Sequence, residues 1–154
     1  GLSNVRFFAM NAEEMTFADE SFDFVFGSSI LHHLNLENAY SEISRVMRPG
    51  GTALFLEPLG HNPLINLYRW WTPGLRTVDE QPMLRCHFKL ADKYFASCEI
   101  RHYGLLTLFA IPVLSTPIAG SVLRVLRFLD RMTLTVPGVK WLSWFTVVEF
   151  RKGR

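Results

Sequence analysis

The pattern of apolar and polar positions divides the first part of the chain into short strands and one helix. Near-continuous apolar runs predict three strands, over residues 5–10, 22–26 and 52–57. Between the last two runs, apolar residues repeat at helical spacing from Leu36 to Met47, with Asn35 as the expected N-cap. Pro49-Gly50-Gly51 is the expected stop of this helix. The order strand, helix, strand predicts a βαβ unit in a parallel sheet.

The second part of the chain has a different character. Frequent proline and glycine residues after Glu57 favour an insertion over residues 58–97, with a short helix at 64–71. The remaining residues, 98–154, are expected to add C-terminal strands and a helix. The patterns predict a helix over 90–96, a strand over 98–103, a helix over 117–131 and a strand over 144–151.

One segment has the length of a membrane span. Residues 104–123 carry no formal charge, and about 20 apolar residues suffice to cross a bilayer. The segment contains two prolines and two glycines and directly follows an expected strand. We therefore interpret it as a strand end, a loop and the start of a helix.

Composition narrows the class of protein. The 154 residues are 49% hydrophobic and 19% charged, which excludes a disordered chain and fits one domain. Cys86 and Cys98 are too few for a disulfide scaffold and lack metal-ligand spacing, so we expect no metal and a cytoplasmic location. The chain opens without an initiator methionine, and we interpret this start as a truncation.

The charge is distributed unevenly. Residues 1–60 carry eight acidic and three basic side chains, whereas residues 61–154 carry six acidic and thirteen basic ones. A basic second half favours an anionic small molecule or membrane headgroups as partner. Nucleic acid is not expected, because the chain has no dense run of basic residues and no known reading motif.

Four motifs stand in a specific order within the first 51 residues. They are Asn-Ala-Glu-Glu-Met from Asn11, Asp-Glu-Ser-Phe-Asp from Asp19, Leu-His-His-Leu from Leu31, and Arg-Pro-Gly-Gly from Arg48. Together they resemble the class I S-adenosylmethionine-dependent methyltransferases, in the branch called methyltransferase type 11. The resemblance is strong over residues 1–57, loose over 58–100 and weaker beyond.

The resemblance implies a Rossmann-like, doubly wound α/β fold with seven strands in the order 3-2-1-4-5-7-6. The five strands expected here would be the family's third to seventh, and the last would be antiparallel. The family's glycine-rich loop and its ribose-binding acid have no counterpart in this sequence. Residues 1–154 thus resemble a partial domain that lacks the first two strands and that, alone, would bind the cofactor poorly.

The same resemblance implies the site residues. S-adenosylmethionine would contact Asn11, Ala12 and Glu13 on its adenine side and Gly27, Ser28 and Ser29 on its methionine side. His33 and Glu57 are candidate catalytic bases for the methyl acceptor. In the insertion, the candidate acceptor-binding residues are His61, Tyr68, Arg69, Arg76 and Glu80.

The implied activity is methyl transfer to a small organic or lipid-like acceptor by in-line displacement, driven mainly by proximity and orientation. Two alternatives stay open. One is a degenerate binding module without catalysis, and the other is a peripheral membrane partner protein anchored by the helix at 117–131. That helix has an apolar face and a basic face, a pattern that suits either a membrane surface or packing on the sheet, which we favour.

Overall fold

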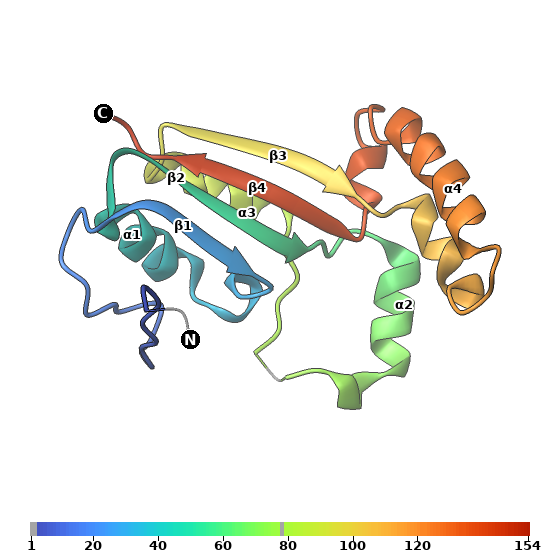
Figure 1. Ribbon diagram of the computed structural model, residues 1–154, viewed down its shortest axis with the longest axis horizontal. Helices are drawn as coiled ribbons and strands as arrows, with labels where there is room; N and C mark the ends of the chain where they lie inside the picture. Colours follow the sequence, from blue (N-terminus) through green and yellow to red (C-terminus); the bar gives the residue numbers. More distant parts are fainter. Residues whose placement is uncertain (1–2, 78) are drawn as a thin grey trace.

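A four-stranded mixed sheet forms the centre of the molecule, described by a computed structural model over residues 3–77 and 79–154 (Figure 1). Its strand order is β1-β2-β4-β3. The strands are β1 (Phe22–Ser28), β2 (Met47–Pro58), β3 (Ser97–Tyr103) and β4 (Phe145–Arg151). β1 and β2 are parallel, and β4 runs antiparallel to both of its neighbours. This is the order 4-5-7-6 that the sequence predicted, with the last strand antiparallel.

Helices cover one face of this sheet. They are α1 (Leu36–Val46), α3 (Arg85–Leu90) and the 3₁₀ helices η1 (Leu31–His33) and η3 (Ala91–Lys93). Phe55 of β2 and Phe150 of β4 are buried against Tyr40 of α1, and Phe150 stacks on Phe95 with ring centroids 4.7 Å apart. These residues form the core, because alternate positions of each strand point to the helical side.

The opposite face of β1 carries large apolar side chains in solvent. Phe24 and Phe26 alternate with the core-facing Val25 and are 55% and 63% exposed. Among the described residues, no element covers them.

The helix α1 begins where the sequence predicted and ends earlier. The Asn35 side chain accepts hydrogen bonds from the backbone N–H groups of Glu37 and Asn38, as an N-cap does. The helix ends at Val46, before the expected Pro49-Gly50-Gly51 stop, because β2 already begins at Met47. Gly50, with φ of +76°, makes a turn within the start of that strand.

Two predicted elements are wrong. Residues 5–10 do not form a strand, and Phe7 is 93% exposed. A strand requires a neighbour for its backbone hydrogen bonds, and the described residues place none beside this segment. The helix expected over 90–96 lies earlier, as α3 followed by η3, since Phe88 and Ala91 enter the core.

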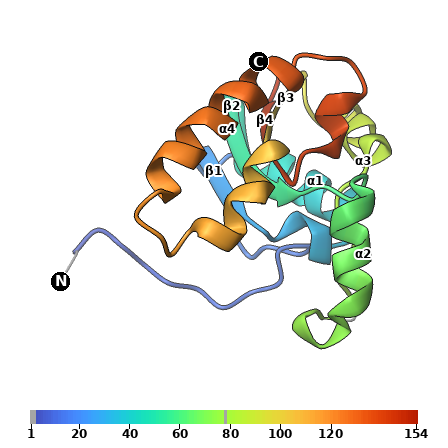
Figure 2. The same ribbon diagram turned by 90° about the vertical axis from the view of Figure 1, so that its right-hand side faces the viewer.

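The insertion and the segment after β3 meet at one end of the sheet (Figures 1 and 2). They comprise α2 (Pro63–Trp71), η2 (Pro73–Leu75), η4 (Leu106–Val113), α4 (Ala119–Thr133) and η5 (Val139–Leu142). The α4 helix packs along η4, not on the sheet as expected. Within the described part of the chain, no helix combines the length and apolarity needed to cross a membrane.

The cap of α1 gives a stability prediction. We expect Asn35→Ala to lower the free energy of unfolding by about 1 kcal/mol, because two N–H groups lose their acceptor. Urea unfolding followed by circular dichroism measures this loss. Asn38→Ala, in the first turn of the same helix, is the control and should cost less than half as much. Equal losses in the two variants would contradict the cap.

Candidate functional site

The end of β2 places a buried carboxylate at the edge of the sheet. Glu57 has no exposed surface, and its Oε1 accepts hydrogen bonds from the backbone N–H groups of Ile30 at 3.0 Å and Leu31 at 2.9 Å. Its Oε2 accepts a third from Nδ1 of His32 at 2.6 Å. Glu57 was predicted as a candidate catalytic base, yet the structure encloses its carboxylate beneath η1, away from solvent. It fastens the turn after β1 to the end of β2.

The two adjacent histidines have different surroundings. His32 lines a cavity of about 250 Å³ at the carboxyl edge of the sheet. Because Nδ1 is engaged by Glu57, Nε2 is the ring nitrogen that remains for a ligand. His33 lies outside this cavity, where its Nδ1 is 3.1 Å from Oδ2 of Asp79 and 3.2 Å from Oγ1 of Thr77.

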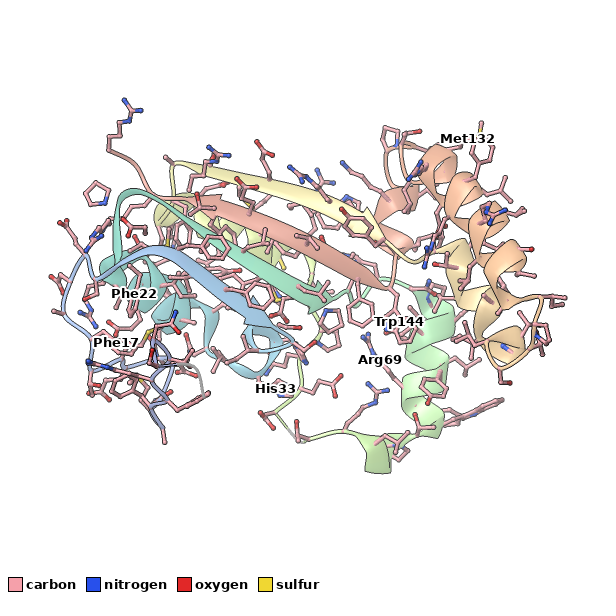
Figure 3. The ribbon with its side chains drawn as sticks, viewed as in Figure 1. Phe17, Phe22, His33, Arg69, Met132 and Trp144 are labelled. Atoms are coloured by element: carbon pink, nitrogen blue, oxygen red, sulfur yellow. The ribbon has the colours of Figure 1, made fainter. Side chains whose placement is uncertain are left out.

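Four residues of the expected acceptor site meet in the 250 Å³ cavity, which we call the arginine cavity. They are Tyr68, Arg69, Arg76 and Glu80, and they face Ser29, His32, Pro58 and Phe145 across it. Arg69 extends from α2 toward the end of the sheet where Trp144 lies (Figure 3). The fifth, His61, lies elsewhere: its ring is 5.6 Å from that of Trp141, and burial lowers its pKa.

The hydrogen bonds in the arginine cavity are incomplete. Nη1 of Arg76 donates to Glu80 at 3.0 Å, and Nη1 of Arg69 donates to the carbonyl oxygen of Leu59 at 3.1 Å. Nε of Arg76 is enclosed and has no partner among the described residues. Burial, and then the charge of Arg76, lower the pKa of Arg69. Two guanidinium groups and one carboxylate therefore leave a positive charge and a free donor for an anion.

A larger apolar groove adjoins the arginine cavity. It measures about 730 Å³ and lies between α2 and η4. The two spaces share Ile65, Tyr68 and Trp144 in their walls. The groove is otherwise lined by Asn62, Pro63, Leu64, Leu105, Leu108, Phe109, Ile111 and Leu142. A polar cavity joined to an apolar groove suits a ligand with a charged group and a hydrophobic part.

The expected cofactor residues after β1 lie at the carboxyl end of that strand. A Cβ on Gly27 would lie 2.4 Å from the Phe55 ring, so this glycine is required by packing on the core side. Ser29 has φ of +53°, its N–H donates to Leu56 at 2.8 Å, and it lines the arginine cavity next to Ser28.

The expected adenine-side loop is fastened to α1. Oδ1 of Asn11 accepts from the N–H of Glu13 at 3.0 Å, across Ala12. The Glu13 carboxylate accepts from the N–H of Asn35 at 2.9 Å. These three residues do not line the arginine cavity.

The amino-acid sequence of this chain is similar to those of known methyltransferases. Residues 1–55 match the family model described as a methyltransferase domain. A sterol 24-C-methyltransferase of Gibberella zeae is 31% identical over 106 residues, which are 66% of this chain and 25% of that protein.

Solved structures extend the likeness to the whole chain. The phosphoethanolamine N-methyltransferase 2 of Haemonchus contortus, in complex with S-adenosyl-L-methionine, has a TM-score of 0.61 at 17% identity over 94% of this chain. The geranyl diphosphate C-methyltransferase of Streptomyces coelicolor, solved with S-adenosyl-L-homocysteine, has a TM-score of 0.58 at 10% identity over 93% of this chain. The fold is that of the class I methyltransferases. This chain spans only 36% and 52% of those two proteins.

A solved structure with this fold holds S-adenosyl-L-methionine. Of the residues expected to contact this cofactor, Ser29 lines the cavity at the carboxyl end of β1, and the Asn11 loop presents polar groups. The sequence supplies no glycine-rich loop and no ribose-binding acid after an earlier strand. Over residues 3–77 and 79–154, no three histidine, cysteine or acidic side chains gather to hold a metal ion.

Sequence reasoning passed over His32 in favour of His33. Both residues belong to the Leu-His-His-Leu motif, and nothing in that motif distinguishes them. The distinction arises because η1 turns His32 toward Glu57 and leaves His33 beside Asp79. Glu57, an acidic residue at the end of the expected strand over 52–57, is the signal in the sequence that could have indicated a buried partner for one of the two histidines.

Glu57 gives the first prediction from this site. We expect Glu57→Ala to lower the free energy of unfolding by about 3 kcal/mol, because three buried donors lose their acceptor. Denaturant unfolding of the parent and the variant measures the loss. Asp79→Ala, which removes an exposed carboxylate beside the other histidine, is the control and should change stability little. Similar stabilities of both variants would contradict an anchoring role for Glu57.

His102 gives a prediction for the dependence of stability on pH. Its Nε2 is enclosed and has no partner among the residues that the structure describes, and burial lowers its pKa to about 4. Between an ordinary pKa of about 6.5 and 4, the unfolded chain binds a proton that the folded chain does not. Stability should therefore fall as the pH decreases through this window, by about 1–2 kcal/mol after allowance for solvent screening. Urea unfolding of the parent and His102→Gln at a series of pH values tests this; an identical fall in both would contradict it.

Proposed function

We propose that this chain forms the acceptor-binding part of an S-adenosylmethionine-dependent methyltransferase whose acceptor is a small amphipathic molecule with an anionic group. The observation that carries the proposal is the arginine cavity, which is lined by two arginines and one carboxylate; Nε of Arg76 has no partner among the described residues. The methyltransferase relatives, which include sterol, phosphoethanolamine and geranyl diphosphate enzymes, support a small apolar or phosphorylated acceptor.

The positive charge of the arginine cavity favours an acceptor that carries an anionic group. Arg69 and Arg76 lie in one cavity, and only Glu80 offsets them there. A carboxylate or phosphate would accept from the guanidinium N–H groups that face the cavity and relieve the repulsion between the two guanidinium groups. The adjoining groove of about 730 Å³ would hold the apolar part of the same molecule.

His32 is the group placed to receive a proton from the acceptor. Its Nδ1–H donates to Glu57, so the Nε2 lone pair is free to accept the proton of a hydroxyl or an amine as the methyl bond forms. Glu57 holds the ring in this orientation. The cofactor, when bound, supplies a methyl group on a sulfonium; Gly27, Ser28 and Ser29 would lie along its methionine side, and Asn11, Ala12 and Glu13 near its adenine.

A second candidate function is a binding module that takes the same amphipathic ligand without transferring a methyl group. The arginine cavity and the groove beside it would hold that ligand whether or not a cofactor is bound, which supports this candidate. The two functions share the arginine cavity and differ only in chemistry, so ligand binding and methyl transfer have to be measured separately.

Binding is tested with cis-parinaric acid, a fluorescent amphipathic carboxylate. We expect Arg69→Gln and Arg76→Gln each to weaken its binding about tenfold, because each removes a charge-assisted hydrogen bond. Arg85→Gln, an exposed arginine stacked over Trp141 outside the cavity, is the matched control and should leave binding unchanged. Equal affinities for the parent and the cavity variants would contradict the anionic subsite.

Methyl transfer is tested by incubating the same proteins with methyl-tritiated S-adenosylmethionine and a panel of prenyl phosphates, fatty acids and hydroxylated lipids. Label in the extracted acceptor that is lost in His32→Gln supports the enzyme. Because this chain alone is expected to bind the cofactor weakly, the assay is run over a series of S-adenosylmethionine concentrations that reaches saturation. Binding of the acceptor without any transfer at a saturating concentration of the cofactor supports the binding module.

A further inference from the structure

The outer side of α4 carries a surface that the proposed methyl transfer does not use. Four apolar side chains project from it: Val125, Phe128, Leu129 and Met132 are 59%, 61%, 38% and 60% exposed. Beside this apolar stripe, the same helix carries three basic side chains, those of Arg124, Arg127 and Arg131. We call these seven residues the α4 face; Met132 marks it at the edge of the molecule in Figure 3.

The helix is held so that this face points outward. Asp130 is buried on the inner side, where its carboxylate accepts from the N–H of Leu106 at 2.6 Å and from the hydroxyl of Thr107 at 3.0 Å. It is the only acidic residue of α4, so no carboxylate lies on the outer side. Rotation of the helix to bury its apolar stripe would break these bonds.

The arginines of the α4 face are available to a partner. None of the three forms an ion pair with a described residue. Arg127 and Arg131 also line a cavity of about 710 Å³ together with Lys140 and Asp130. A row of unpaired cations beside an apolar stripe is complementary to a surface that is anionic outside and apolar beneath.

Neighbouring elements also carry exposed apolar side chains. Phe109, Ile111 and Leu114, in and just after η4, are 64%, 52% and 53% exposed. The helix α2 lies at the same end of the molecule as α4 (Figure 1), and its Trp70 and Trp71 are 75% and 70% exposed. Exposed tryptophan and phenylalanine suit the boundary between headgroups and acyl chains. Phe109 and Ile111 also line the apolar groove, so the groove borders this end.

We propose that the α4 face binds the surface of an anionic phospholipid bilayer, with α4 lying in the plane of the headgroups. Its fifteen residues span roughly 22 Å, less than the hydrocarbon core, so the helix lies on the bilayer and does not cross it. A second copy of this chain fits less well, because a symmetric contact would bring two rows of arginines together.

Vesicle co-sedimentation tests this with phosphatidylcholine alone and with about one third phosphatidylglycerol added. We expect the parent chain to partition at least tenfold more strongly onto the anionic vesicles. Arg124→Gln, Arg127→Gln and Arg131→Gln together should lower that partitioning about a hundredfold, and Phe128→Ser with Met132→Ser about tenfold or more. High salt should weaken the binding of the parent chain to anionic vesicles and change the binding of the arginine variant little.

Matched control variants remove positive charges or an aromatic ring outside the α4 face. Lys89→Gln, Arg101→Gln and Arg151→Gln delete three exposed cations outside the α4 face, and Phe7→Ser deletes an exposed aromatic ring; both should bind vesicles like the parent. Circular dichroism establishes that each variant is folded. Equal binding to neutral and anionic vesicles, or equal losses in face and control variants, would overturn the proposal. So would a dimer in light scattering that the Phe128→Ser and Met132→Ser changes convert to a monomer while vesicle binding persists.

Discussion

The buried carboxylate of Glu57 is the contact on which the candidate site depends. It joins the ends of two parallel strands by accepting from two consecutive backbone N–H groups and from His32. A fully buried carboxylate is costly unless each of its oxygens is satisfied, and here both are. The turn after β1 is therefore fixed, and with it the ring of His32 at the wall of the arginine cavity.

The cavity itself is built from residues that are distant in the sequence. Ser29 comes from the end of β1, Pro58 from the end of β2, and Arg69 and Arg76 from the insertion. The insertion closes over the carboxyl edge of the sheet because Asn62 caps α2 and its side-chain N–H also donates to the carbonyl oxygen of Leu142 at 2.6 Å. The same packing opens the apolar groove beside it. Polar recognition and apolar volume thus arise from one arrangement of α2 against the C-terminal segment.

The acidic first part and the basic second part of the chain have different roles in the proposed function. The acidic first part supplies β1, β2, the core helix α1 and the fixed turn. The basic second part supplies the arginine cavity, the groove and the α4 face, and it holds the excess of positive charge. A ligand with an anionic group and an apolar part, and a surface with the same two properties, would both find complementary chemistry in this part.

The sequence by itself located most elements of the sheet, and its resemblance to class I methyltransferases implied their strand order. Alternating and helical periodicities located β1, α1, β2, α2, β3 and β4, because their apolar positions serve the core directly. Asn35 was identified as a cap since local hydrogen bonding decides that role. The motifs around Asn11, Leu31 and Pro49 indicated the class I methyltransferase fold.

Only the tertiary structure decided which side chains share a cavity. His32 and His33 are equivalent in the sequence, and the choice between them depends on a carboxylate 25 residues away from His32. Residues 5–10 have a strand-like pattern, but an extended chain gains stability only from a neighbouring strand. The α4 helix was expected on the sheet, yet the position of Asp130 against η4 turned its apolar stripe outward. In each case the deciding partner lies far along the chain, where periodicity carries no information about it.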